Sequence, residues 1–198
     1  MLIMNTPISA ILLALTVIPL PAIGQVAPPS AVGTPAPSFK PGWVAQGVSF
    51  NNGVIGDVPL ASAVIGAAQD DAFAVMAKQT SGKAGGVVLK GMINAAETGT
   101  YGFVLDIQDG GQSGFCNYAL SIDGKPAMAY RNPEPKPAVA DKAVELTAGR
   151  HPIEIAVGCS RPSVSKVRVA LRVKLPSGDA AVTPSADFII HATRASGD

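Results

Sequence analysis

The chain has 198 residues, a length that suits one domain of ordinary size, and a formal net charge of +1. Only 15% of its residues are charged, against about 25% in an average protein. A nucleic-acid-binding protein would carry a basic excess, so this balance argues against nucleic acid as a partner. Glycine (21) and proline (17) are frequent but have no three-residue period, which excludes collagen and indicates a turn-rich β chain.

The first 24 residues have the pattern of an export signal. No Asp, Glu, Lys or Arg occurs before Lys40, and residues 8–20 form an apolar run (ISAILLALTVIPL) that is shorter than a membrane span of about 20 residues. Small residues then stand at the −3 and −1 positions of a cleavage before Gln25. Because residues 1–7 carry no Lys or Arg, an uncleaved N-terminal anchor is the alternative. We expect a signal peptide over residues 1–24 and a periplasmic or secreted mature protein.

A proline-rich segment follows over residues 25–42. Its five prolines lack backbone donors and favour extended polyproline geometry over a helix or a strand ladder. Two interpretations remain open: a disordered start of the mature chain, or an extended arm that becomes ordered on a partner. In the second, Phe39 and Trp43 are candidate aromatic anchors on the partner surface.

Beyond Trp43 the apolar residues recur with period two, which is typical of strands with one buried and one solvated face. The expected strands, in chain order, cover residues 73–76, 87–93, 101–107, 116–121, 153–157, 167–175 and 188–190. The clearest is 167–175 (VRVALRVKL), whose even positions include Arg168, Arg172 and Lys174. This basic face is interpreted either as ordinary solvated surface or as a docking patch for an acidic partner.

Short turns separate these strands, and no window of 12 residues shows a helical stripe with caps. Asp123-Gly124 predicts a two-residue hairpin, and residues 132–137 (NPEPKP) predict a surface loop because their prolines cannot join a central ladder. About eight strands without intervening helices predict an all-β, antiparallel β-sandwich. We place this domain at residues 43–192, followed by a tail at 193–198.

The chain contains two cysteines, Cys116 and Cys159. In an exported protein they enter an oxidising compartment, where only one pairing within the chain is possible. We therefore expect a disulfide between them. Two separate buried thiols are the alternative, which a cytosolic location would favour.

Three segments in succession carry a family resemblance. They are residues 88–103, which contain VLKGMI and ETGTYGF, residues 118–125 (YALSIDGK), and residues 145–155 (ELTAGRHPIEI). In order and spacing they resemble the PA14 module over residues 86–176. The resemblance implies an exported β-sandwich of antiparallel strands that is used for carbohydrate or protein binding.

In the sugar-binding members of that family, a pair of aspartates holds calcium and the calcium holds sugar hydroxyls. Here Gln108 stands where the first acid is expected. The candidate binding residues are Asp109, Gly110, Gly111, Gln112 and Asn117. The pair Asp70-Asp71 is either a second candidate or a solvated turn. Calcium takes about six to eight oxygen ligands, so we expect no cofactor, with calcium an option only if the chain binds carbohydrate.

A catalytic signature is missing from the sequence. His151 and His191 each lie beside a strand and are interpreted as turn or solvated histidines. Residues 111–115 (GQSGF) miss the nucleophile-elbow pattern and open a strand rather than a helix. Neither cysteine has a second Cys or a His at metal-ligand spacing. We therefore do not expect an enzyme.

Two function classes remain. The main hypothesis from the sequence is a non-catalytic accessory or assembly subunit of an exported, membrane-associated protein complex, with the small non-redox subunit of membrane-bound quinoprotein dehydrogenases as one such case. The alternative is a PA14-like carbohydrate-binding module that recognises cell-surface glycan. Calcium-dependent stability or binding would favour the second class, and co-purification with a larger membrane enzyme would favour the first.

Overall fold

The structure, a computed structural model, describes residues 37–67, 71–108, 116–131, 140–160 and 166–193. These residues form an antiparallel β-sandwich with one helix, as the sequence predicts. The described part of the chain contains no helix with the length and apolarity that a membrane crossing requires. The expected signal peptide at residues 1–24 and the loop at 132–137 lie outside the described residues.

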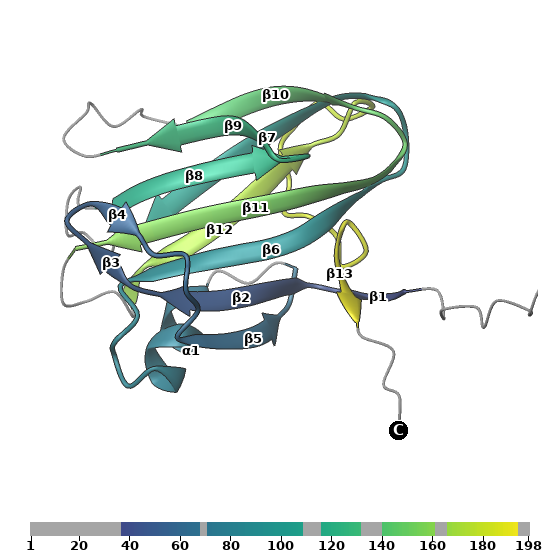
Figure 1. Cartoon of the computed structure of the whole chain (residues 1–198). Helices are drawn as coiled ribbons and strands as arrows, with labels where there is room; N and C mark the ends of the chain where they lie inside the picture. The colour runs from purple at the N-terminus through teal and green to yellow at the C-terminus, as the bar shows by residue number, and fades with distance from the viewer. Residues whose placement is uncertain (1–36, 68–70, 109–115, 132–139, 161–165, 194–198) are drawn as a thin grey trace, which may run out of the picture. The chain divides into compact units, whose positions relative to one another are not determined.

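The larger sheet has eight antiparallel strands (Figure 1). Its main path runs through β1 (Ser38–Pro41), β13 (Ile189–Thr193), β6 (Gly86–Ala95), β11 (Gly149–Cys159), β8 (Cys116–Ile122) and β9 (Lys125–Tyr130). Beside β6 lies β2 (Trp43–Val48), which also pairs with β5 (Ala61–Ile65).

The smaller sheet has three antiparallel strands in the order β10 (Ala140–Leu146), β7 (Gly99–Gln108) and β12 (Arg168–Lys174). A separate short hairpin is formed by β3 (Phe50–Asn51) and β4 (Val54–Ile55). Side chains from the larger and the smaller sheet, and from helix α1 (Ala72–Gln79), make one hydrophobic core. On β12 the odd positions Val169, Leu171 and Val173 are buried in it, which confirms the period-two prediction.

The hairpin expected at Asp123-Gly124 is present between β8 and β9. Both turn residues have positive φ, 52° and 70°, as a two-residue type I′ turn requires. The expected disulfide is also present: Cys116 and Cys159 are register partners at the ends of β8 and β11, and their sulfurs are bonded. The bond therefore ties two central strands of the larger sheet together at one end.

The strand predicted at residues 73–76 is wrong, because these residues lie in helix α1 (Ala72–Gln79). Phe73 and Met76 are three positions apart, so on a helix they share one face, and both are fully buried. Gly47 of β2 allows the helix to approach closely, since a Cβ at that position would lie 3.1 Å from the Met76 Cβ. The packing of Phe73 and Met76 in the core therefore stabilises a helix here, where the sequence pattern alone predicts a strand.

The proposed anchor role of Trp43 is contradicted by the structure. Its side chain is 1% exposed, and its Nε1 donates a hydrogen bond to the Ala67 carbonyl at 3.1 Å. Phe39 lies on β1, which pairs with β13, and the Arg150 guanidinium sits 3.9 Å from the centroid of its ring. Both aromatic side chains therefore make contacts within this chain. For Trp43 the physical reason is that removing a large apolar side chain from water is favourable, so the indole packs in the core instead of standing exposed.

At the opposite end of the sheet from the disulfide, His151 links two turns. Its Nδ1 lies 2.8 Å from Asp123 Oδ2, and its Nε2 lies 2.8 Å from the Thr147 carbonyl oxygen. Both partners are acceptors, so both ring nitrogens can donate only in the protonated imidazolium. Burial lowers the pKa of His151, but the hydrogen bonds to Asp123 and Thr147 and the charge of Asp123 outweigh it, so the pKa is raised above its ordinary value.

Asp123→Asn is expected to destabilise the chain most at acidic pH. A histidine whose pKa is raised on folding stabilises fully below its unfolded pKa of about 6.5, and this stabilisation is lost as the pH rises through the folded value. The effect is at most about 1 kcal/mol, because the Asp123 side chain is 41% exposed and solvent screens the pair. Urea unfolding of both proteins between about pH 5.5 and 8.5 measures it. A difference that stays constant or grows with pH would contradict this account.

Candidate functional site

A hollow of about 300 Å³ lies on the outer face of the larger sheet, near the end that carries the disulfide. Its floor consists of three alanines on adjacent strands: Ala129 of β9 pairs with Ala119 of β8, which pairs with Ala156 of β11. Because all three side chains are single methyl groups, the sheet surface stays low here. The volume is at the lower end of the roughly 300–1,000 Å³ typical of small-molecule sites.

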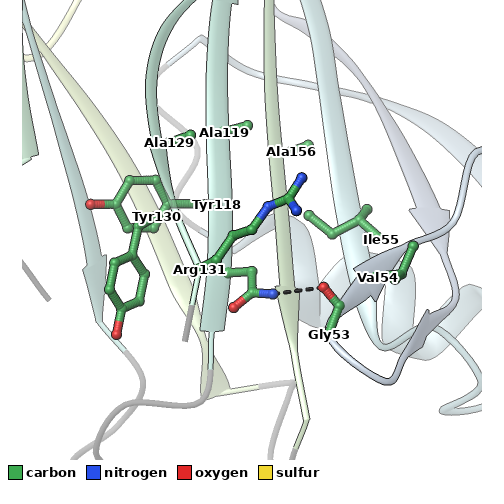
Figure 2. Close-up of a pocket in the computed structure, with 10 residues that line it drawn as sticks. Gly53, Val54, Ile55, Tyr118, Ala119, Ala129, Tyr130, Arg131 and Ala156 are labelled. Carbon is green, nitrogen blue, oxygen red and sulfur yellow. Dashed lines mark hydrogen bonds between the residues drawn. The ribbon is translucent and has the colours of Figure 1, made fainter. Parts of the chain in front are cut away.

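One wall of the hollow is the β3–β4 hairpin, whose residues Gly53, Val54 and Ile55 line it. The Asn117 side chain, 6% exposed, holds this hairpin by donating a hydrogen bond from Nδ2 to the Gly53 carbonyl at 2.7 Å (Figure 2). Gly158, the register partner of Asn117, lies directly beneath the hairpin. A Cβ at Gly158 would stand 2.7 Å from Phe50 Cε2, so the wall can pack here only because position 158 has no side chain.

Arg131 supplies the charge of the hollow. It follows β9 directly, and its guanidinium extends over the hollow between Ala156 and Ile55 (Figure 2). Among the described residues that line the hollow, Arg131 is the single charged side chain. The guanidinium has five N–H donors and a positive charge. No carboxylate among the described lining residues neutralises this charge.

Below the floor, two tyrosines close the same end of the sandwich. Tyr118 and Tyr130 are register partners, and their stacked rings have centroids 5.5 Å apart. Their rings point away from Arg131 (Figure 2) and are buried in the core. Burial, followed by the neighbouring Tyr130, raises the pKa of Tyr118 above its ordinary value, so the phenol stays protonated. The stacked pair therefore lies on the inner side of the strands that form the floor.

The structure brings one of the predicted binding residues, Asn117, into this hollow. The other candidates of that loop, Asp109, Gly110, Gly111 and Gln112, lie outside the described residues, as does Asp70. Sequence reasoning missed Arg131, the alanine floor and the hairpin. For the hairpin a signal was present, since Asn52-Gly53, with φ of 52° and 79°, is a strong type I′ turn sequence.

Asp71 is placed at the start of α1, where its carbonyl accepts the first helical hydrogen bond from Val75 N–H at 3.1 Å. Its Oδ1 is buried without a hydrogen-bond partner. Over the ranges that the structure describes, no group of three or more His, Cys, Asp or Glu side chains could hold a metal ion. Asp71 supplies one carboxylate of the about six to eight oxygens that calcium takes, and Asp70 lies outside the described residues, so the calcium option at this pair stays a prediction.

The basic side chains of β12 lie elsewhere. Arg168, Arg172 and Lys174 are exposed on the outer face of the smaller sheet, as their alternation predicts. That face and the alanine floor belong to different sheets, so the structure does not bring the basic strand into the hollow.

No protein-family model and no curated protein matches the sequence. Among solved structures, the PA14 domain of the antifreeze protein MpAFP aligns with a TM-score of 0.50 and 14% identity, over 80% of this chain and 94% of that one. This chain has a PA14-like fold. An anti-sigma factor domain-containing protein aligns with a TM-score of 0.57 and 15% identity, over 82% of this chain and 51% of that one. A PA14 sugar-binding domain from an RTX adhesin aligns with a TM-score of 0.46 and 15% identity, over 77% and 99%.

The PA14 resemblance read from the sequence is thereby confirmed for the fold. The three matching segments form the β6–β7 connection, the β8–β9 hairpin and the turn from β10 to β11. In this PA14-like sandwich, the floor of the hollow is built on β8, β9 and β11, and one of the three segments, residues 118–125, contributes Ala119 to it.

Proposed function

We propose that this chain is an exported, non-catalytic PA14-like module that binds a glycan in the hollow over Ala119, Ala129 and Ala156. The observation that carries the proposal is the hollow itself, which combines a flat apolar floor with a guanidinium at its rim. A sugar ring has an apolar C–H face and polar hydroxyl edges. The C–H face fits the three methyl groups, and the hydroxyls fit the donors of Arg131.

The fold alone does not assign this function, because one fold hosts many functions and a function depends on the residues of the site. The composition of the described lining supports a binding role, since its two phenols, Tyr118 and Tyr130, have their rings buried in the core and its one other titratable side chain is the guanidinium of Arg131. The Cys116–Cys159 disulfide supports export, because such bonds persist in oxidising compartments.

The accessory-subunit hypothesis loses its two candidate aromatic anchors, while residues 25–36 of the proline-rich segment lie outside the described residues. Trp43 belongs to the core, and Phe39 is covered by Arg150. In the described part of the chain, no observation favours that hypothesis over glycan binding. Pull-down from the native envelope, with and without residues 25–36, which precede β1, is the experiment that would restore it.

Ala119→Trp is expected to abolish glycan binding, because an indole on the floor fills a hollow of about 300 Å³. The mature chain is screened on a glycan array, and the affinity of each bound glycan is then measured for wild type and variant. Ala143→Trp is the matched control, an exposed alanine on β10 of the smaller sheet. We expect the control to bind as wild type does, and Ala119→Trp to bind at least about tenfold more weakly.

Two results would overturn the proposed function. The first is an array on which the folded, disulfide-bonded chain retains no glycan. The second is full affinity of Ala119→Trp for the glycan that the wild type binds, with unchanged thermal stability.

A further inference from the structure

The hollow has a net positive charge among its described residues. A guanidinium is charged at all physiological pH values, and no carboxylate belongs to the described lining. The acid on the same outward face of β11, Glu154, is paired with Lys90 of β6 at 3.5 Å. Arg131 therefore has no acidic partner among the residues around it that the structure describes.

An arginine in this setting selects for the charge of the ligand. Guanidinium groups bind carboxylates and sulfates through two parallel N–H donors, and such charge-assisted hydrogen bonds are about twice as strong as neutral ones. A neutral sugar would use the same donors for hydroxyls and gain less. A cation would be repelled, so calcium cannot mediate binding at the position of the guanidinium.

The floor and the charge together define an occupant. We propose that the glycan held in the hollow is acidic: its ring lies on Ala119, Ala129 and Ala156, and its carboxylate or sulfate group binds the Arg131 guanidinium. This inference rests on the proposed function and deepens it by naming the class of sugar.

The test compares matched ligands that differ only in charge. Calorimetric titration uses a uronic-acid-containing oligosaccharide and its carboxyl-reduced neutral counterpart, and then a sulfated galactoside and its unsulfated form. All titrations contain EDTA, so that calcium bridging between an acidic sugar and the protein is excluded. Each pair is measured at low and at high salt, because exposed charge pairs are screened by salt.

Wild type is expected to bind the acidic member of at least one pair about tenfold more tightly than the neutral one, with the preference reduced at high salt. Arg131→Gln should bind both members with the affinity of the neutral one. Arg131→Lys keeps the charge but loses the planar fork, so it should retain part of the preference. Arg172→Gln, which removes an exposed arginine from the smaller sheet, is the matched control and should behave as wild type.

Equal wild-type affinity for the charged and neutral members of both pairs would overturn this inference and leave the proposed function standing. A preference that persists in Arg131→Gln would overturn it as well, because the charge would then be read elsewhere. Loss of all binding to every ligand, together with an empty glycan array, would overturn the inference and the proposed function at once.

Discussion

Replacing Cys116 and Cys159 together by serine is expected to lower the free energy of unfolding by about 4 kcal/mol. The two residues are 43 positions apart, and a cross-link over such a loop removes a large part of the conformational entropy of the unfolded chain. Because a domain has only about 5–15 kcal/mol of stability, this loss is a large fraction of the total. The bond also fastens β8 to β11 beside the hollow, so glycan affinity is expected to fall with stability.

Urea unfolding of wild type and the double variant measures this difference, and thiol titration of the denatured wild type checks that the bond exists. Reduced wild type should unfold at the same denaturant concentration as the double variant, which serves as the control for the serine substitutions themselves. Two titratable thiols in unreduced wild type, or equal unfolding midpoints for oxidised and reduced protein, would contradict the prediction.

Gly158→Ala is expected to cost about 1–3 kcal/mol and to weaken glycan binding. The added Cβ would lie 2.7 Å from Phe50 Cε2 and 2.8 Å from Ile55 Cγ1, both closer than carbon atoms pack. Relief requires the β3–β4 hairpin to lift from β11, which stretches the hydrogen bond from Asn117 to the Gly53 carbonyl and moves one wall of the hollow.

The matched control is Gly178→Ala, at which the nearest atom to an added Cβ is the Leu175 carbonyl oxygen at 3.6 Å, an ordinary contact. This variant should stay within about 0.5 kcal/mol of wild type and bind glycan unchanged. Thermal unfolding and affinity are measured for both variants. If Gly158→Ala matches Gly178→Ala in both measurements, the hairpin does not form a wall of the site.

The candidate site could be predicted only in part. Asn117 stood among the candidate residues because it lies on the strand that follows the expected binding loop. Arg131 and the three alanines carried no signal: a lone arginine after a strand is ordinary surface, and single alanines in strands have no pattern of their own. The alanines form the floor of a hollow only because the strand register places Ala129, Ala119 and Ala156 side by side.

Helix α1 and Trp43 show the same limit in the core. The run from Phe73 to Met76 is short and apolar, and periodicity alone does not distinguish a strand from a helix over four residues. Trp43 follows a proline-rich segment, so its neighbours in the sequence favoured exposure. Its burial depends on β2 pairing with β6 about forty residues later.

By itself, the sequence determined the β-sandwich, because the alternation of apolar and polar side chains can be recognised within each strand separately. It also determined the single possible disulfide. The tertiary structure alone decided where a ligand can lie, because the hollow joins Gly53, Asn117, Arg131 and Ala156 from four separate stretches of the chain. Contacts between residues so far apart in the sequence depend on strand register and on the space that a glycine leaves. Neither can be recognised from a local sequence pattern.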